Sequence, residues 1–229
     1  MNRTMTRTWT WLVLVSSLAL GPIGSAQASA QEGAQYTITF TRLWTGTSHP
    51  FEYPKQGLLT GPHLSGLIGC SHGGGYTLFK VGTPPTPGLE NLSENGKHSP
   101  LDAEIKAAIA AGKAGALFET GPIRDAAKTE TTTVRVTDAN PTVSAVAMIA
   151  PSPDWFAGAA DVTLKEDGKW VDTKTVEMFA YDSGGDDGTT YEAADKDTSP
   201  KKPATVLEDA HFVVNGKKPP VATLTFTKQ

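Results

Sequence analysis

The sequence predicts an all-β fold, an antiparallel β-sandwich or barrel with one or two short helices. Three observations predict it. Apolar residues alternate with threonine in several segments, as they do in half-buried strands. These segments are rich in threonine, valine and aromatic residues, which strands favour. Glycine, proline and Asp-Gly turns separate them.

The alternation is clearest near the start, where Tyr36, Ile38 and Phe40 alternate with threonines. Segment 143–150 is instead a continuous apolar run between two prolines, as expected for a strand in the core. The predicted strands, in chain order, are 36–41, 76–81, 131–137, 143–150, 159–164, 170–181, 211–214 and 221–227.

One helix is predicted after Ser99-Pro100-Leu101-Asp102, which offers a cap and a proline in the first turn. Residues 103–111 follow, with Ile105 and Ile109 four apart, and Gly112 ends the run. The stretches 82–87 and 192–203 contain prolines and polar residues and are predicted to be loops.

The N-terminal segment has the pattern of a secretory signal peptide. Arg3 and Arg7 precede an apolar stretch at 9–20, and small residues follow. We expect cleavage after Ala28 or Ala30, and the alternative is an uncleaved anchor. The apolar stretch is shorter than the roughly 20 residues that span a bilayer.

We therefore assign residues 1–30 to a signal peptide and residues 34–229 to one domain, secreted or periplasmic. No later segment is apolar and long enough to cross a membrane. The formal net charge of −4 becomes −6 without residues 1–30, so nucleic acid is a poor partner. Cys70 is the single cysteine, so stability must come from a hydrophobic core, a metal or both.

Two acidic loops follow predicted strands. The first is Pro-Ser-Pro-Asp-Trp at 151–155, and the second is Tyr-Asp-Ser-Gly-Gly-Asp-Asp-Gly at 181–188. Between them, Asp167-Gly168 is a strong two-residue hairpin turn. If it joins regular strands, residue 154 lies opposite Tyr181, and the two loops share one end of the fold. The apolar residues change parity along this hairpin, so we expect a bulge.

Carboxylates gathered in this way repel one another, and a hard cation with oxygen ligands resolves the repulsion. Calcium suits irregular loops, whereas magnesium keeps more water. Zinc prefers cysteine or histidine, and neither loop contains one. The spacing after Asp182 excludes an EF-hand. The alternative is that these acids are solvated turn residues.

The same residues resemble the spondin domain family. The resemblance rests on the Pro-Thr-Val-Ser-Ala-Val-Ala-Met-Ile-Ala-Pro-Ser-Pro-Asp-Trp-Phe-Ala-Gly segment at 141–158 and on Trp170 followed by the loop at 181–188. Weaker likeness extends over 36–50, 67–72 and 88–105. Together these segments span nearly all of the chain after the predicted signal.

The resemblance implies a β-sandwich like a C2 domain and a calcium ion held by Asp154, Asp182 and Asp186. The chain departs from the family's pattern in two places. Gly185 stands where the family has threonine, and Asp187 is an additional acid. The adhesive modules that accompany this domain in animal matrix proteins are not expected here.

We therefore expect an exported, non-enzymatic, calcium-binding module for an extracellular protein or glycan. One alternative is a secreted hydrolase, because His72-Gly73-Gly74-Gly75 matches the oxyanion motif of lipases. That chemistry also needs a Gly-x-Ser-x-Gly elbow, which the sequence lacks. Another alternative is calcium-dependent attachment to a membrane or glycan through Trp155 and Phe156, although both rings are expected to pack under the loop.

Overall fold

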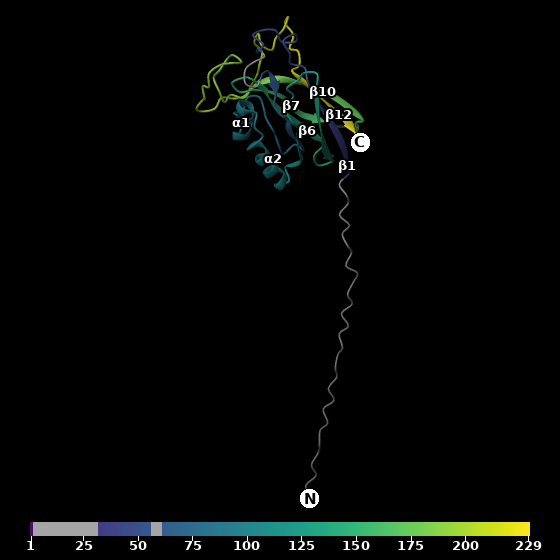
Figure 1. Ribbon diagram of the computed structural model, residues 1–229. Coiled ribbons are helices and arrows are strands. Elements are labelled where there is room, and N and C mark those ends of the chain that lie inside the picture. Colours follow the sequence, from purple (N-terminus) through teal and green to yellow (C-terminus); the bar gives the residue numbers. More distant parts are fainter. Residues whose placement is uncertain (2–31, 56–60) are drawn as a thin grey trace. The chain divides into compact units, whose positions relative to one another are not determined.

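The computed structural model describes Met1, residues 32–55 and residues 61–229 (Figure 1). Apart from Met1, the predicted signal peptide and its cleavage sites lie outside the described residues. Residues 31–229 group into one compact unit. Within the described part of the chain, no helix combines the length and apolarity that a membrane crossing requires.

Strands dominate this unit, and all the pairings between them are antiparallel. The strands are β1 (Gly33–Arg42), β2 (His63–Leu64), β3 (Ile68–His72), β4 (Ala114–Glu119), β5 (Thr129–Thr137), β6 (Thr142–Ala150), β7 (Trp155–Thr163), β8 (Lys165–Glu166), β9 (Lys169–Trp170), β10 (Thr173–Asp182), β11 (Thr205–Val206) and β12 (Ala222–Lys228). The described part of the chain contains two helices, α1 (Pro87–Asn95) and α2 (Leu101–Ala110).

One long sheet has the strand order β4-β3-β6-β7-β10-β12-β1-β5, with β2 paired to β6 and β11 paired to β10. The sheet curls until its two ends approach each other. Ser71 of β3 donates from Oγ to the Arg135 carbonyl of β5 at 2.8 Å and accepts from the Ala116 amide of β4 at 2.8 Å. The predicted all-β antiparallel class with one or two short helices is confirmed, and the two layers of the sandwich are halves of one curled sheet.

The main core lies between these halves. It contains the inward side chains of β1 and β12, such as Phe40 and Phe226, together with β6 and β7 residues such as Ala147 and Trp155. On their other face, β1 and β12 are half-buried or exposed and rich in threonine. In register, Thr37, Thr39 and Thr41 of β1 lie beside Thr133, Thr131 and Thr129 of β5 and beside Thr227, Thr225 and Thr223 of β12.

A second core explains why β6 is apolar throughout. Both helices cover the other face of β3, β6 and β7 (Figure 1), so every residue of β6 after the first is buried. This core includes Ile68, Val146 and Phe156 from the sheet and Leu92 and Ile105 from the helices.

Two expected strands are wrong. Segment 76–81 has no strand, although Leu78 and Phe79 are buried in the second core. Segment 211–214 is a turn whose His211 and Phe212 are buried. In both places the apolar side chains that suggested a strand instead anchor a loop in the core.

The helices match the expectation at α2 and add a second at α1. Gly112, which has a φ of +69°, follows α2 as predicted. At α1, Thr86 caps the N-terminus by accepting from the Leu89 amide at 3.2 Å, and Pro87 occupies the first turn. This Thr-Pro start is a helix signal inside a stretch expected to be a loop.

The alternation along β12 gives a direct test of the main core. Phe226 is fully buried, whereas the next residue, Thr227, is exposed. We expect Phe226→Ala to lower the free energy of unfolding by about 3–5 kcal/mol, because it removes a buried ring and leaves a cavity. Thr227→Ala should change it by less than about 1 kcal/mol. Urea unfolding measures both, and equal costs would contradict the assigned faces.

Cys70 gives a test of the second core. It is fully buried, and burial raises the pKa of its thiol to about 12, well above the usual value of about 8.5. The reactive thiolate is therefore scarce at pH 8. We expect a thiol reagent to label Cys70 only after unfolding in guanidinium. Equal labelling rates in buffer and in denaturant would show that this core is open.

Candidate metal centre

The β7–β10 hairpin brings the two acidic loops together. Its turn is at Asp167-Gly168, whose φ angles are +49° and +76°, and Lys165 pairs with Trp170 there as the sequence predicts. Nearer the site, Asp182 pairs with Trp155, so the register has shifted by two residues. This shift is the irregularity in strand pairing that the sequence predicts. Where the two loops meet, the Ser183 amide donates a hydrogen bond to the Asp154 carbonyl at 3.2 Å.

Asp154 lies at the centre of the meeting point, and its side chain is fully buried. Its Oδ2 accepts from the Ser183 hydroxyl at 2.8 Å, the Gly185 amide at 2.8 Å and the Asp186 amide at 3.2 Å. Its Oδ1 is buried without a hydrogen-bond donor. Burial raises the pKa of this carboxyl, while its three donors oppose the rise. One oxygen of Asp154 therefore has its partners, and the other has none.

The other two aspartates accept hydrogen bonds from backbone amides of the second loop and, at Asp186, of Lys196. Asp182 accepts from the Gly184 amide at 2.8 Å, and Asp186 accepts from the Gly188 amide at 2.5 Å and from the Lys196 amide. Burial raises the pKa of Asp182 to about 6, and the nearby charges of Asp154 and Asp186 add to the rise. The charges of Asp154 and Asp186 therefore disfavour the charged form of Asp182.

The glycines of the second loop are required by close contacts. Gly184 has a φ of +85°, and a Cβ there would lie 2.1 Å from the Lys202 carbonyl. At Gly185, where the resemblance leads one to expect threonine, a Cβ would lie 2.7 Å from Oε1 of Glu94. Thr198 holds both glycine carbonyls with its hydroxyl, at 2.8 Å each. The loop is thus packed between α1 and the segment near residue 200.

A second acidic group lies beside this loop. Glu90, Glu94 and Asp197 each present an oxygen within 4.8 Å of the others, and Lys201 lies 2.8 Å from Glu90 and forms an ion pair with Asp197. Its ammonium also contacts the Gly185 carbonyl at 3.3 Å. Burial and the neighbouring Glu90 raise the pKa of Glu94 to about 7.

Sequence reasoning missed this second group. Its one available signal is the spacing of Glu90 and Glu94, four apart on a helix, which places both on one face. Nothing in the sequence connects α1 with Asp197. The additional acid Asp187 is directed elsewhere: it forms an ion pair with Lys202 and lies 4.0 Å from Lys196.

The donors at the loops suit a hard cation. Carboxylate oxygens come from both loops, and neither loop has a sulfur or imidazole ligand. The buried Oδ1 of Asp154 has the chemistry of a ligand atom without its partner. The donor types of the buried Asp154 and Asp186 and of the part-buried Asp182 therefore suit calcium. Among the described residues, however, the acidic group whose three ligand atoms lie within 4.8 Å of one another is Glu90, Glu94 and Asp197.

His72, the residue behind the hydrolase alternative, is buried with its partners. Its Nε2 lies 2.8 Å from the Ser144 hydroxyl and 3.6 Å from a carboxylate oxygen of Asp161. His72 is 1 % exposed and Ser144 is 2 % exposed, so a substrate could not reach this pair without rearrangement. The arrangement is that of a structural histidine that links β3 to β6.

The two aromatic residues after Asp154 also face inward. Trp155 packs against Tyr191, His211 and Phe212, and Phe156 stacks on Tyr181. Trp155 is 1 % exposed and Phe156 is 0 % exposed. Both rings therefore support the loop from below, as expected, and do not form an apolar contact surface.

Comparison with known proteins identifies the family of this chain. The family model described as Spondin_N matches residues 34–213. Spondin-2 of Rattus norvegicus is 28% identical over 233 aligned positions, covering 96% of this chain and 70% of the rat protein. Spondin-2 of Homo sapiens is 30% identical over 186 positions, covering 80% and 55% of the two chains.

A third relative, Spondin-1 of Mus musculus, is 30% identical over 187 positions. That match covers 76% of this chain but only 22% of the mouse protein. The chain thus spans only about a fifth of the length of that relative. Because the family model matches well over half of the sequence, this chain belongs to the Spondin_N family.

Proposed function

We propose that this chain is an exported, non-enzymatic binding module in which a calcium ion joins the two aspartate loops. The observation that carries the proposal is the buried Oδ1 of Asp154, which has no hydrogen-bond donor. Asp182 and Asp186, from the other loop, are the further ligands we propose.

Electrostatics supports this assignment. Removing a carboxylate from water costs several kcal/mol unless hydrogen bonds or an opposite charge compensate. At Asp154, donors compensate one oxygen only, and the neighbouring carboxylates add repulsion. A divalent cation would supply the missing partner and remove the repulsion in one step.

Calcium fits better than the other common cations. The loops offer carboxylates of unequal burial and irregular backbone, which the variable coordination of calcium tolerates. Magnesium requires near-octahedral geometry and keeps several waters. When bound, the ion would fix the β6–β7 loop to the β10 loop and so stiffen this end of the sheet.

Two observations support a binding role: the family of the chain, and the burial of the His72 motif that suggested a hydrolase. The matched relatives are spondins, and the His72–Ser144 pair is buried. The N-terminal pattern supports export. We propose an extracellular protein or glycan as the partner, with no role for nucleic acid, because the domain is acidic.

Calcium should raise the melting temperature of the metal-free protein. At a free concentration 100-fold above the dissociation constant, a ligand adds about 2.7 kcal/mol of stability, which is roughly 5–10 °C for a domain of this size. The combined variant Asp154→Asn, Asp182→Asn, Asp186→Asn should lose this rise. Differential scanning calorimetry with calcium, and then with a chelator, measures it.

Asp187→Asn is the matched control, because Asp187 lies in the same loop but pairs with lysine. It should keep the full rise. A second control, Glu94→Gln, tests the neighbouring acidic group. If the wild type shows no rise, the proposal fails. If only Glu94→Gln removes the rise, the ion belongs to the other group and the aspartate assignment is wrong.

A further inference from the structure

The outer face of one half of the sheet carries a regular array of threonines. Four neighbouring strands, in the order β10-β12-β1-β5, each place three side chains on this face. Eleven of these twelve positions are threonine, and Glu177 at one corner is the exception. The rows across the strands are Thr173-Thr227-Thr37-Thr133, Thr175-Thr225-Thr39-Thr131 and Glu177-Thr223-Thr41-Thr129. We call these twelve side chains the threonine face.

The threonine face is open to solvent. Each of its side chains is exposed or part-exposed, whereas the residues between them on β1 and β12, such as Phe40 and Phe226, are buried in the main core. Two hydrogen bonds within the described residues engage its hydroxyls. Thr175 bonds with Thr225 at 2.9 Å, and Nε2 of Gln229 donates to Thr37 at 3.0 Å. Within the part of the chain that the structure describes, most hydroxyls of the face are therefore available to water or to a ligand.

Strand propensity alone does not account for this array. Threonine suits strands, but valine, isoleucine and tyrosine suit them as well, and edge strands commonly carry lysine. β5 is the last strand in the order of this sheet, yet its outward positions are Thr129, Thr131 and Thr133. The face therefore repeats one chemistry, a methyl group beside a hydroxyl, in two dimensions.

Backbone geometry sets the spacing of the array. Neighbouring strands lie about 4.8 Å apart, and alternate residues of one strand lie about 6.7 Å apart. Branching at Cβ restricts the χ1 angle of threonine, so each methyl and each hydroxyl keeps a defined position. A ligand that complements the whole face must itself be periodic in two dimensions.

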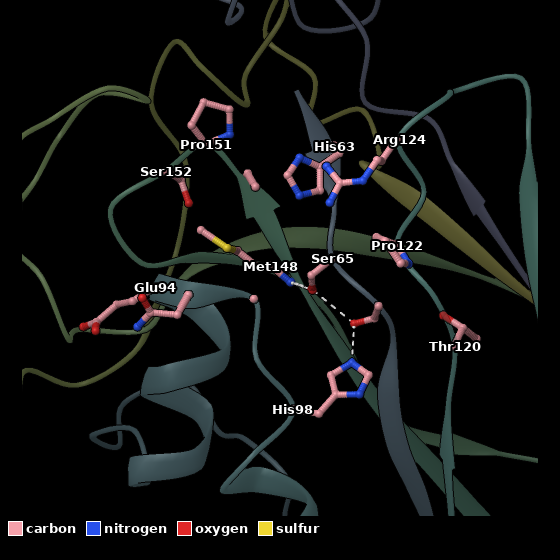
Figure 2. A pocket seen from close by; sticks show the side chains of 14 residues that line it. His63, Ser65, Glu94, His98, Thr120, Pro122, Arg124, Met148, Pro151 and Ser152 are labelled. Carbon is pink, nitrogen blue, oxygen red and sulfur yellow. Dashed lines mark hydrogen bonds between the residues drawn. The ribbon is translucent and has the colours of Figure 1, made fainter. Parts of the chain in front are cut away.

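Charge narrows the choice of ligand further. A groove of about 620 Å³ beside the first aspartate loop has both a guanidinium, Arg124, and a carboxylate, Glu94, among its lining residues (Figure 2), so its walls select neither an anion nor a cation. The threonine face is different, because Glu177 is its one charged member. It also lacks the aromatic rings that commonly line sites for organic ligands. The ligand that suits it is an uncharged lattice of hydrogen-bonding groups.

We propose that the threonine face binds the surface of ice crystals. The water oxygens on a crystal face repeat in two dimensions at distances similar to the spacing of the threonines. Threonine hydroxyls both donate to and accept from water, and methyl groups restrict the orientation of the water beside them. Because the face is preformed, many weak contacts can add up at a small entropic cost. This activity goes beyond the proposed binding module, and it uses neither the ion nor the aspartate loops.

The twist of the sheet limits the strength of binding. Neighbouring strands are rotated by roughly 20–25° relative to each other, so a flat crystal face fits best over the central strands β1 and β12. We therefore expect the protein to slow the growth of ice grains while lowering the freezing point very little. Thr39 and Thr225 lie opposite each other at the centre of the face, so changes there should have the largest effect.

The test consists of two measurements on the purified protein. One is its partition between a slowly growing ice surface and the remaining liquid, and the other is the size of ice grains in a frozen sucrose solution held just below its melting point. We expect the protein to enter the ice and to keep the grains small. Thr39→Tyr should raise the concentration needed for the same grain size by about tenfold, because a central ring holds the crystal away from the surrounding threonines.

A second variant, Thr39→Lys with Thr225→Lys, adds charge in place of bulk and should have the same effect. Thr163→Tyr is the matched control, since Thr163 is an exposed threonine of β7, outside the threonine face. It should behave as the wild type does. Thermal melting shows that each variant is folded, and tyrosine is well tolerated in strands. A chelator should leave the partition unchanged, because no member of the face lies in the aspartate loops.

Several results would overturn the inference. The wild type could remain in the liquid as an unrelated acidic protein does, or both variants at Thr39 could partition as the wild type does. Retention on cellulose powder without entry into ice would assign the face to a neutral polysaccharide. A dimer that Thr39→Tyr dissociates, again without entry into ice, would assign it to a second copy of the chain. Loss of the partition in chelator would move the ice contact to the aspartate loops.

Discussion

The buried carboxylate of Asp154 organises this end of the fold. Its Oδ2 gathers three donors from the second loop, and the Ser183 hydroxyl among them accepts in turn from Ser93 of α1 at 3.0 Å. The chain of contacts runs from the strand hairpin through the glycine loop to a helix. Without that carboxylate, the loop amides would lose their shared acceptor, and buried donors without acceptors are costly.

Much of the fold could be predicted because its signals are local. Alternation identified β1, β5 and β12, and Asp167-Gly168 placed the hairpin turn correctly. Two apolar segments misled, because a buried loop and a strand can share one composition, as at Phe79 and Phe212. The pattern of apolar residues indicates which side chains are buried, but it does not indicate whether the backbone pairs with a neighbouring strand.

The site divides in the same way. The meeting of the two acidic loops was predictable because a hairpin returns the chain near its starting point, and that argument survives a two-residue shift in register. The choice of Asp154, Asp182 and Asp186 as ligands came from the resemblance to the spondin domain family. The second acidic group could not be foreseen. Glu94 lies on α1 and Asp197 lies about a hundred residues later in a loop, with no local pairing rule between the two segments, and only the tertiary fold brings them together.

The charges at this end are sorted by depth. The carboxylates near the surface form ion pairs with lysines: Lys201 pairs with Glu90 and Asp197, and Lys202 pairs with Asp187. Asp154, deeper and between the loops, has only backbone and hydroxyl donors on one oxygen and none on the other. A lysine could neutralise an outer carboxylate at little cost, since its stem stays near water. An inner carboxylate leaves no room for such a side chain, which is why we propose a small ion as its partner.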